Sequence, residues 1–298
     1  MADRAQAFAK RFLILTLLLG FSASARASEE HTRFCEQMTQ AYADFKWPPF
    51  VCPKQAPKVG GKSVEERPIL YWEFGNPQAT NTTLVFSMVH GDEVTPLYVG
   101  LKTLEWMEQH AEKLKDARVV IAPLINPDGY FKSPRTRTNA RGVDVNRNFN
   151  TSDWKASALL AWKNQYKSNP RRYPGPTAHS EPETVFQTYL IEEFKPQKIL
   201  SIHAPLGFMD YDGPNTLALS RFPKEYVKRA LELKKRLKAV SGGFFPGSLG
   251  NYAGQERGIP TFTLELPTAD PKRAQRYWNE FRRGIETMVK YEVPKQGG

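Results

Sequence analysis

Two polar segments that each follow directly on a short apolar run restrict the fold of this chain more than any other feature of its sequence. The segment His90-Gly-Asp-Glu93 follows the apolar run 83–89, and His203 follows the apolar run 198–202. Short apolar runs bounded by turn residues are typical of buried strands. Because open α/β sheets place their functional sites just beyond strand ends, we expect both segments to meet at one edge of a sheet.

Helical segments alternate with these apolar runs. Thr95-Pro96 is predicted to begin a helix that ends near residue 114, with proline in its first turn, and Asp270-Pro271 to begin a final helix. This alternation predicts an α/β fold with a mixed, largely parallel twisted sheet and helices on both faces. Because we find neither an internal repeat nor a low-complexity linker, we predict one large domain at residues 65–298 after a short extension at 28–64.

The spacing His-x-x-Glu allows a histidine and a carboxylate to reach one metal ion from a turn after a strand. A second, distant histidine would complete a set of two histidines and one carboxylate with an open fourth position, the pattern of catalytic zinc. The chain has five histidines, and two of them, His90 and His203, belong to this set. We therefore predict that His90, Glu93 and His203 bind one zinc ion per chain. Glu265 lies in the apolar run 261–266, where a carboxylate is costly to bury without a function or a partner.

The first 27 residues have the pattern of an export signal. Positive residues precede an apolar run at 12–20, and Ala25-Arg26-Ala27 has the form of a signal-peptidase site. The apolar run is shorter than the roughly 20 residues that span a membrane. We predict an exported, periplasmic protein that is not inserted in the membrane after cleavage. An uncleaved signal anchor is the alternative.

Both cysteines of the chain, Cys35 and Cys52, lie in the extension at 28–64. In an oxidising compartment we expect them to form a disulfide, with two free buried thiols as the alternative. The formal net charge of +11 would suit an anionic substrate. Because no nucleic-acid-binding motif accompanies it, we interpret positive segments such as 224–238 as solvated surface and predict no nucleic-acid partner.

Five motifs give the chain its resemblance to the zinc carboxypeptidases of the carboxypeptidase A superfamily, which implies a three-layer fold of that type. They occur in order over residues 69–288. The segments around 146–147 and 203 are most similar to the bacterial branch of murein peptide amidases and D,L-carboxypeptidases. The motifs are HGDE at 90–93, NPDG at 126–129, RTNARGVDVNRNF at 137–149, SIHAPLGFMDYDGP at 201–214 and TFTLELP at 261–267.

The resemblance implies a role for each position that matches the family pattern. The zinc ligands would be the three residues named above, and Glu265 would be the general base that takes a proton from the zinc-bound water. Arg137 would polarise the scissile carbonyl. Asp144 would accept a hydrogen bond from a ligand histidine and so fix its tautomer. Arg135 and Arg141, in the same basic stretch, are interpreted as surface charges.

Two further positions, Asn146 and Arg147, would bind the terminal carboxylate of the substrate. The planar guanidinium of arginine can donate two parallel hydrogen bonds to a carboxylate, which a lysine cannot do. Leu249 matches the specificity position of the family and would favour apolar side chains. The chain departs from the digestive members at two places. Asp92 stands where they have a substrate-binding arginine, and the segment 242–246 lacks their mobile tyrosine.

Together these features predict a hydrolase, a zinc metallocarboxypeptidase that cleaves the terminal amide bond of murein peptides between D-glutamate and meso-diaminopimelate. Diaminopimelate carries a second ammonium on its side chain, and we hypothesise that Asp210 and Asp212 bind it. An ordinary turn beside Gly213-Pro214 is the alternative for these aspartates. Three other functions stay open: a carboxypeptidase for ordinary protein C-termini, a deacylase of N-acyl amino acids, and an inactive cell-wall-binding protein of the same fold.

Overall fold

The computed structural model describes residues 28–213, 223–226 and 245–293. The predicted export signal at 1–27 and most of the positive segment 224–238 lie outside these residues. The chain divides into two compact units, Met1–Lys58 and Val59–Gly298. None of the helices in the described ranges is both long and apolar enough to cross a membrane.

In the described part of the first unit, a helix at residues 28–44 is followed by a segment of turns and irregular structure. Cys35 on the helix forms a disulfide with Cys52, and their Cα atoms lie 5.4 Å apart, which confirms the predicted bridge. The rings of Tyr42 and Trp47 pack edge to face with their centroids 5.0 Å apart. A unit this small has little apolar core, so the covalent bridge and the aromatic pair are expected to stabilise it.

The second unit is built on a seven-stranded sheet with the strand order β1-β2-β4-β3-β5-β7-β6. The central strands β4, β3, β5 and β7 are parallel, whereas β2 and β6 pair antiparallel with β4 and β7. The sheet is thus mixed and largely parallel, as predicted. The strands are β1 (Lys58–Lys62), β2 (Pro68–Gly75), β3 (Asn81–Ser87), β4 (Ala117–Ala122), β5 (Lys198–His203), β6 (Phe208–Asp212) and β7 (Thr261–Glu265).

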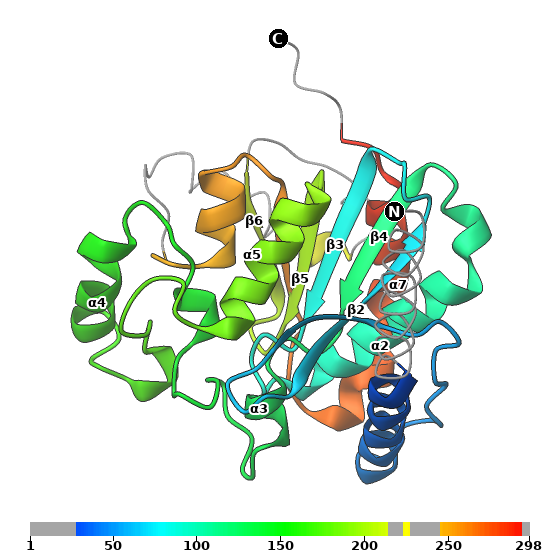
Figure 1. The fold of residues 1–298 in the computed structure, drawn as a ribbon, viewed down its shortest axis with the longest axis horizontal. Coiled ribbons are helices and arrows are strands. Elements are labelled where there is room, and N and C mark those ends of the chain that lie inside the picture. Colours follow the sequence, from blue (N-terminus) through cyan, green and yellow to red (C-terminus); the bar gives the residue numbers. More distant parts are fainter. Residues whose placement is uncertain (1–27, 214–222, 227–244, 294–298) are drawn as a thin grey trace, which may run out of the picture. The chain divides into compact units, whose positions relative to one another are not determined.

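Helices cover both faces of this sheet (Figure 1). Helix α5 packs on one face of β3, and α2 and α7 pack on the other. The three layers agree with the α/β fold that the sequence predicts. The helices are α2 (Val94–Gln109), α3 (Pro127–Phe131), α4 (Trp154–Asn164), α5 (Pro182–Phe194) and α7 (Ala274–Lys290), with short 3-10 turns at Ala111–Lys113, Val145–Arg147, Pro170–Arg172 and Pro271–Arg273 and a π-helical turn at Gly250–Gln255.

The main apolar core lies between the sheet and α5. Leu84 and Phe86 of β3 point toward this layer, together with Phe186 and Leu190 of α5. Every residue of β3 is buried, because a central parallel strand is covered on both of its faces. The strand therefore holds the residues that follow it, including His90, at a fixed place on the edge of the sheet.

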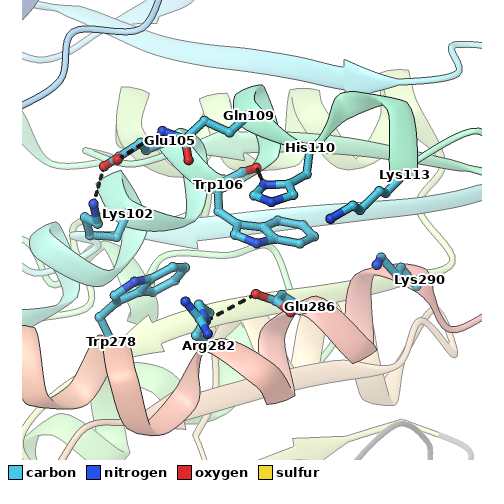
Figure 2. Close-up of a pocket in the computed structure, with 10 residues that line it drawn as sticks. All are labelled: Lys102, Glu105, Trp106, Gln109, His110, Lys113, Trp278, Arg282, Glu286 and Lys290. Carbon is cyan, nitrogen blue, oxygen red and sulfur yellow. Dashed lines mark hydrogen bonds and ion pairs between the residues drawn. The ribbon is translucent and has the colours of Figure 1, made fainter.

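A cavity of about 390 Å³ lies between α2 and α7 on the opposite side of the sheet from α5 (Figure 2). Trp106 and Trp278 extend into it from the two helices. An ion pair of 3.3 Å joins Arg282 and Glu286 at its wall. None of the residues predicted from the sequence to form the site lines this cavity.

Candidate metal centre and active site

The three predicted metal ligands lie together at the ends of two neighbouring strands. Strands β3 and β5 are adjacent and parallel, so the turn after β3 and the last residue of β5 meet at one edge. His90 lies in that turn, Glu93 directly precedes α2, and His203 ends β5. All three side chains are buried. Their ligand atoms lie within 4.8 Å of one another.

Both oxygens of Glu93 face a ring nitrogen of a histidine. Its Oε1 lies 2.8 Å from His90 Nδ1, and its Oε2 lies 3.1 Å from His203 Nδ1. The two Nδ1 atoms are themselves 3.1 Å apart. Although burial opposes a charge on Glu93, the two histidines hold the pKa of this carboxyl well below its usual range. The group is thus an ionised carboxylate between two imidazoles.

Each imidazole has an oxygen within hydrogen-bond distance of its Nε2. His90 Nε2 lies 3.1 Å from Asp144 Oδ1, and His203 Nε2 lies 2.9 Å from Ser201 Oγ. If each Nε2–H donates to its neighbouring oxygen, both Nδ1 atoms present lone pairs to the same point. Two facing lone pairs repel each other unless a cation lies between them. Two imidazole nitrogens and a carboxylate are the donors of a catalytic zinc site, so these residues fit the predicted ion.

Arg137 is held at the rim of this centre by two carboxylates. Its Nε donates to Asp144 Oδ2 at 2.9 Å and its Nη1 donates to Glu93 Oε1 at 3.1 Å. Burial opposes the charge of Arg137, but Asp144, Glu93 and Asp92 together raise the pKa of the guanidinium. Burial also opposes the charge of Asp144, but Arg137 and His90 hold the pKa of this carboxyl far below its usual range. Arg137 therefore stays cationic beside the predicted metal ligands.

Glu265 ends β7, the strand next to β5, and is the partner of His203 in the register of that pair. Burial raises the pKa of Glu265 to about 7, while the charge of His203 opposes this increase and that of Glu93 adds to it. The backbone N–H of Leu206 donates to its Oε2 at 3.4 Å. A carboxylate in this environment can exchange a proton near neutral pH.

Arg147 is a buried cation that lacks a carboxylate partner in the described part of the chain. Its side chain lies over the ring of Phe245 at 4.6 Å, and its Nη1 donates to the backbone oxygen of Asn146 at 2.5 Å. Its Nε is buried and has no hydrogen-bond partner among the described residues. Burial lowers the pKa of Arg147; the charge of Asp144 opposes this decrease, and that of Arg137 adds to it. An anion from outside the described residues would offset the buried charge of Arg147.

The side chain of Asn146 faces the protein backbone. Its Oδ1 accepts a hydrogen bond from the N–H of Leu249 at 2.8 Å and so fixes the start of the π-helical turn. The Leu249 side chain is 3% exposed and belongs to the core cluster between the sheet and α5. Of the segment 242–246, which lacks the family tyrosine, residues 242–244 lie outside the described residues.

Asp210 and Asp212 lie on the edge strand β6. In the register of β6 with β7, Phe208 pairs with Glu265 and Asp210 with Thr263, so Asp210 and Asp212 face the same side of the sheet as Glu265. Burial raises the pKa of both aspartates. The pKa of Asp212 is raised to about 7, and the charge of Asp210 adds to this increase. Gln255 Nε2 donates to Asp212 Oδ1 at 3.0 Å.

Ser201 is the site residue that the sequence analysis missed. A signal was present, because residues two apart in a strand point to the same face, and Ser201 is two residues before His203. Polar residues are common at strand ends. The spacing alone therefore could not show that this serine is a hydrogen-bond partner of the predicted ligand His203.

Comparison with known proteins agrees with this geometry. Residues 52–298 match the zinc carboxypeptidase family. The chain is 30% identical over 213 residues to murein peptide amidase A of Escherichia coli, covering 70% of this chain and 79% of that protein. It is 30% identical over 218 residues to murein peptide amidase A of Vibrio campbellii, covering 71% and 79%. The crystal structure of murein-tripeptide amidase from Escherichia coli O157 has the same fold, with a TM-score of 0.54 at 20% identity over 80% of this chain and 93% of that one.

Proposed function

Because this chain belongs to the zinc carboxypeptidase family, a family of hydrolases, we propose that it removes diaminopimelate from murein peptides by cleaving the D-glutamyl–diaminopimelate bond. The observation that carries the proposal is the meeting of His90, Glu93 and His203 beside Glu265 at the ends of β3, β5 and β7. The 30% identity to murein peptide amidases supports the choice of substrate.

The proposed metal site consists of His90, Glu93 and His203, whose three ligand atoms face one point. Zinc bound there would polarise the scissile carbonyl and lower the pKa of a water molecule toward neutrality. Asp144 and Ser201 would keep both imidazoles in the tautomer that binds a cation. These two residues act on the reaction through the ligands and do not touch the substrate.

The proposed general base is Glu265. It would take a proton from the attacking water and later deliver that proton to the leaving amine, so the carboxylate is regenerated in each cycle. Its burial supports this role, because a pKa of about 7 matches a group that accepts and releases protons near neutral pH.

Arg137 is proposed to stabilise the negative charge that develops on the carbonyl oxygen. Two of its N–H groups are used by Asp144 and Glu93, which fix the plane of the guanidinium. A donor that is already oriented stabilises the transition state without reorganisation during the reaction. The remaining N–H groups of Arg137 are the donors that would serve the oxygen.

The terminal carboxylate of the substrate is proposed to bind Arg147. This guanidinium is buried beside the centre and has no carboxylate partner in the described residues, so a substrate carboxylate would supply the missing charge. Asn146, which the sequence analysis predicted to bind the same carboxylate, accepts a hydrogen bond from the Leu249 N–H with its Oδ1, so its Nδ2 is proposed as the donor to the substrate. This arrangement favours an exopeptidase.

The second ammonium of diaminopimelate is proposed to bind Asp210 and Asp212. Asp212 is buried and Asp210 is half-buried, both face the same side of the sheet as Glu265, and the described residues give neither an ion-pair partner. A cationic side chain would offset the cost of burying two acidic groups. The alternative substrate, an ordinary C-terminus with an apolar side chain, depends on Leu249, whose side chain lies in the core.

Purified protein should be incubated with murein tripeptide, tetrapeptide and pentapeptide, and the products identified by mass spectrometry. We expect the tripeptide to lose diaminopimelate and an ordinary peptide with a leucine C-terminus to stay intact. Cleavage of the ordinary peptide with no cleavage of any murein peptide would overturn the proposed substrate. Export is also a proposal: the mature protein should be recovered from the periplasm with Ser28 as its first residue.

A further inference from the structure

An ion pair links the metal-binding turn to a distant short helix. Asp92 directly precedes the proposed metal ligand Glu93, and its Oδ2 lies 2.6 Å from Nη1 of Arg171. Arg171 belongs to the 3-10 turn Pro170–Arg172. The Asp92 side chain is 21% exposed and that of Arg171 is 55% exposed. The guanidinium is therefore fixed at one end and open to solvent at the other.

This pair differs from an ordinary surface ion pair because Asp92 depends on it. Asp92 Oδ1 is buried and has no hydrogen-bond partner within the described residues, so Arg171 is the group that compensates its charge. The backbone of Arg171 is fixed as well, because its N–H donates to Asn169 Oδ1 at 2.9 Å. Side chain and backbone together hold the guanidinium in one place.

The short helix borders the substrate site. The backbone N–H of Asp144, the carboxylate between His90 and Arg137, donates to the backbone oxygen of Tyr173 at 2.8 Å. This bond ties the residue after the Pro170–Arg172 turn to the centre of the site.

We propose that Arg171, positioned by Asp92, binds a free carboxylate on the acyl side of the scissile bond and thereby selects glutamyl substrates joined through their side chain. The inference rests on the proposed function and adds a specificity-determining residue to it. When glutamate is linked through its γ-carboxyl, its α-carboxylate stays free and lies a few bonds from the scissile carbonyl. An ordinary peptide linkage has no charge at this place.

The chemistry of Arg171 suits this ligand. One of its five N–H groups serves Asp92, which leaves donors for a second carboxylate. Because the charge of Arg171 already offsets that of the Asp92 carboxylate, the pair is neutral before the substrate arrives, and the bound carboxylate is held by directed hydrogen bonds more than by net charge. The partial exposure of Arg171 lets a substrate reach it without any movement of the core.

Two substrates test the inference: L-alanyl-γ-D-glutamyl-diaminopimelate, and the same tripeptide with the glutamyl α-carboxylate converted to an amide. We expect the zinc-loaded wild type to cleave the acid about tenfold more efficiently in kcat/KM, mostly through KM, because a hydrogen bond to a charged group is lost with the amide. Arg171→Gln should remove the preference, so that the ratio of the kcat/KM values for the acid and the amide falls to about one. Arg171→Lys should keep part of the preference.

Arg276→Gln is the matched control, because Arg276 is a 71% exposed arginine on α7 outside the site, and it should keep the full preference. Equal cleavage of acid and amide by the wild type would overturn the inference. So would an Arg171→Gln protein that loses activity equally on both substrates, because that result indicates a structural role. Cleavage of neither substrate by the zinc-loaded wild type would overturn the proposed function itself.

Discussion

At the scale of single residues, two carboxylates of the centre each contact more than one functional side chain. Glu93 contacts both ligand histidines and also accepts a hydrogen bond from Arg137. Asp144 fixes the tautomer of His90 with one oxygen and the guanidinium of Arg137 with the other. Because these contacts share partners, substitutions among them are expected to be non-additive. Glu265 and Arg147 stand outside the shared network and therefore give cleaner tests.

The first prediction at this scale concerns the base. Glu265→Gln keeps the shape of the side chain and removes the proton acceptor. We expect the zinc content to stay at the wild-type level while kcat falls by about 100- to 10,000-fold. Metal analysis and steady-state kinetics on murein tripeptide measure the two quantities on the same sample. A near-normal rate for this variant would show that the base is another group.

A second prediction concerns the terminal carboxylate. A murein tripeptide amidated at the carboxylate beside the cleaved bond cannot form a charged pair with Arg147, so it should react roughly 10- to 100-fold more slowly than the free acid. Arg147→Ala should narrow the difference by slowing only the free acid. Rates are compared under kcat/KM conditions. If both forms react equally with the wild type, Arg147 does not select a chain terminus.

At the scale of elements, parallel pairing of β3 with β5 and of β5 with β7 brings the site together. The sequence predicted strands at 83–89, 198–202 and 261–266, because short apolar runs mark them clearly. It also predicted a helix from 95 to about 114, and the structure has α2 at Val94–Gln109 followed by a 3-10 turn. Strand β6 was not predicted, because its two aspartates stand directly before Gly213-Pro214 and were interpreted as possible turn residues.

A buried acid at the start of α5 gives a prediction about stability. Burial raises the pKa of Glu183 to about 7, although Asn139 Nδ2 donates to its Oε2 at 2.8 Å. An acid with a raised folded-state pKa stabilises the fold below its unfolded pKa near 4.5, and this stability is lost as the pH rises to about 7. Glu183→Gln should therefore be more stable than the wild type at pH 8, by at most about 3 kcal/mol.

Chemical denaturation of both proteins at pH 4 and pH 8 measures this difference. The gain in unfolding free energy should be large at pH 8 and close to zero at pH 4, because the wild-type acid is protonated there in both states. Other titrating groups contribute equally to both proteins and cancel in the comparison. A variant less stable than the wild type at pH 8 would show that Glu183 acts as a charged partner in the fold.

At the scale of the whole molecule, the family, the α/β layers and the three candidate ligands could be predicted because they depend on local motifs. Contacts between segments distant in sequence could not. The pair Asp92–Arg171 joins residues 79 positions apart, and neither position carries a pattern that points to the other. The packing of Leu249 into the core could not be predicted from the sequence either, because an apolar residue is found both in binding pockets and in cores.

The most direct test of the account is a joint measurement of zinc content and hydrolysis of murein tripeptide by the wild type and by His203→Ala. The wild type should hold about one zinc per chain, lose zinc and activity together on treatment with a chelator, and regain both when zinc is added back. His203→Ala, which removes one of the three ligands, should hold little zinc and show no activity. A His203→Ala protein with full zinc and full turnover would contradict the account.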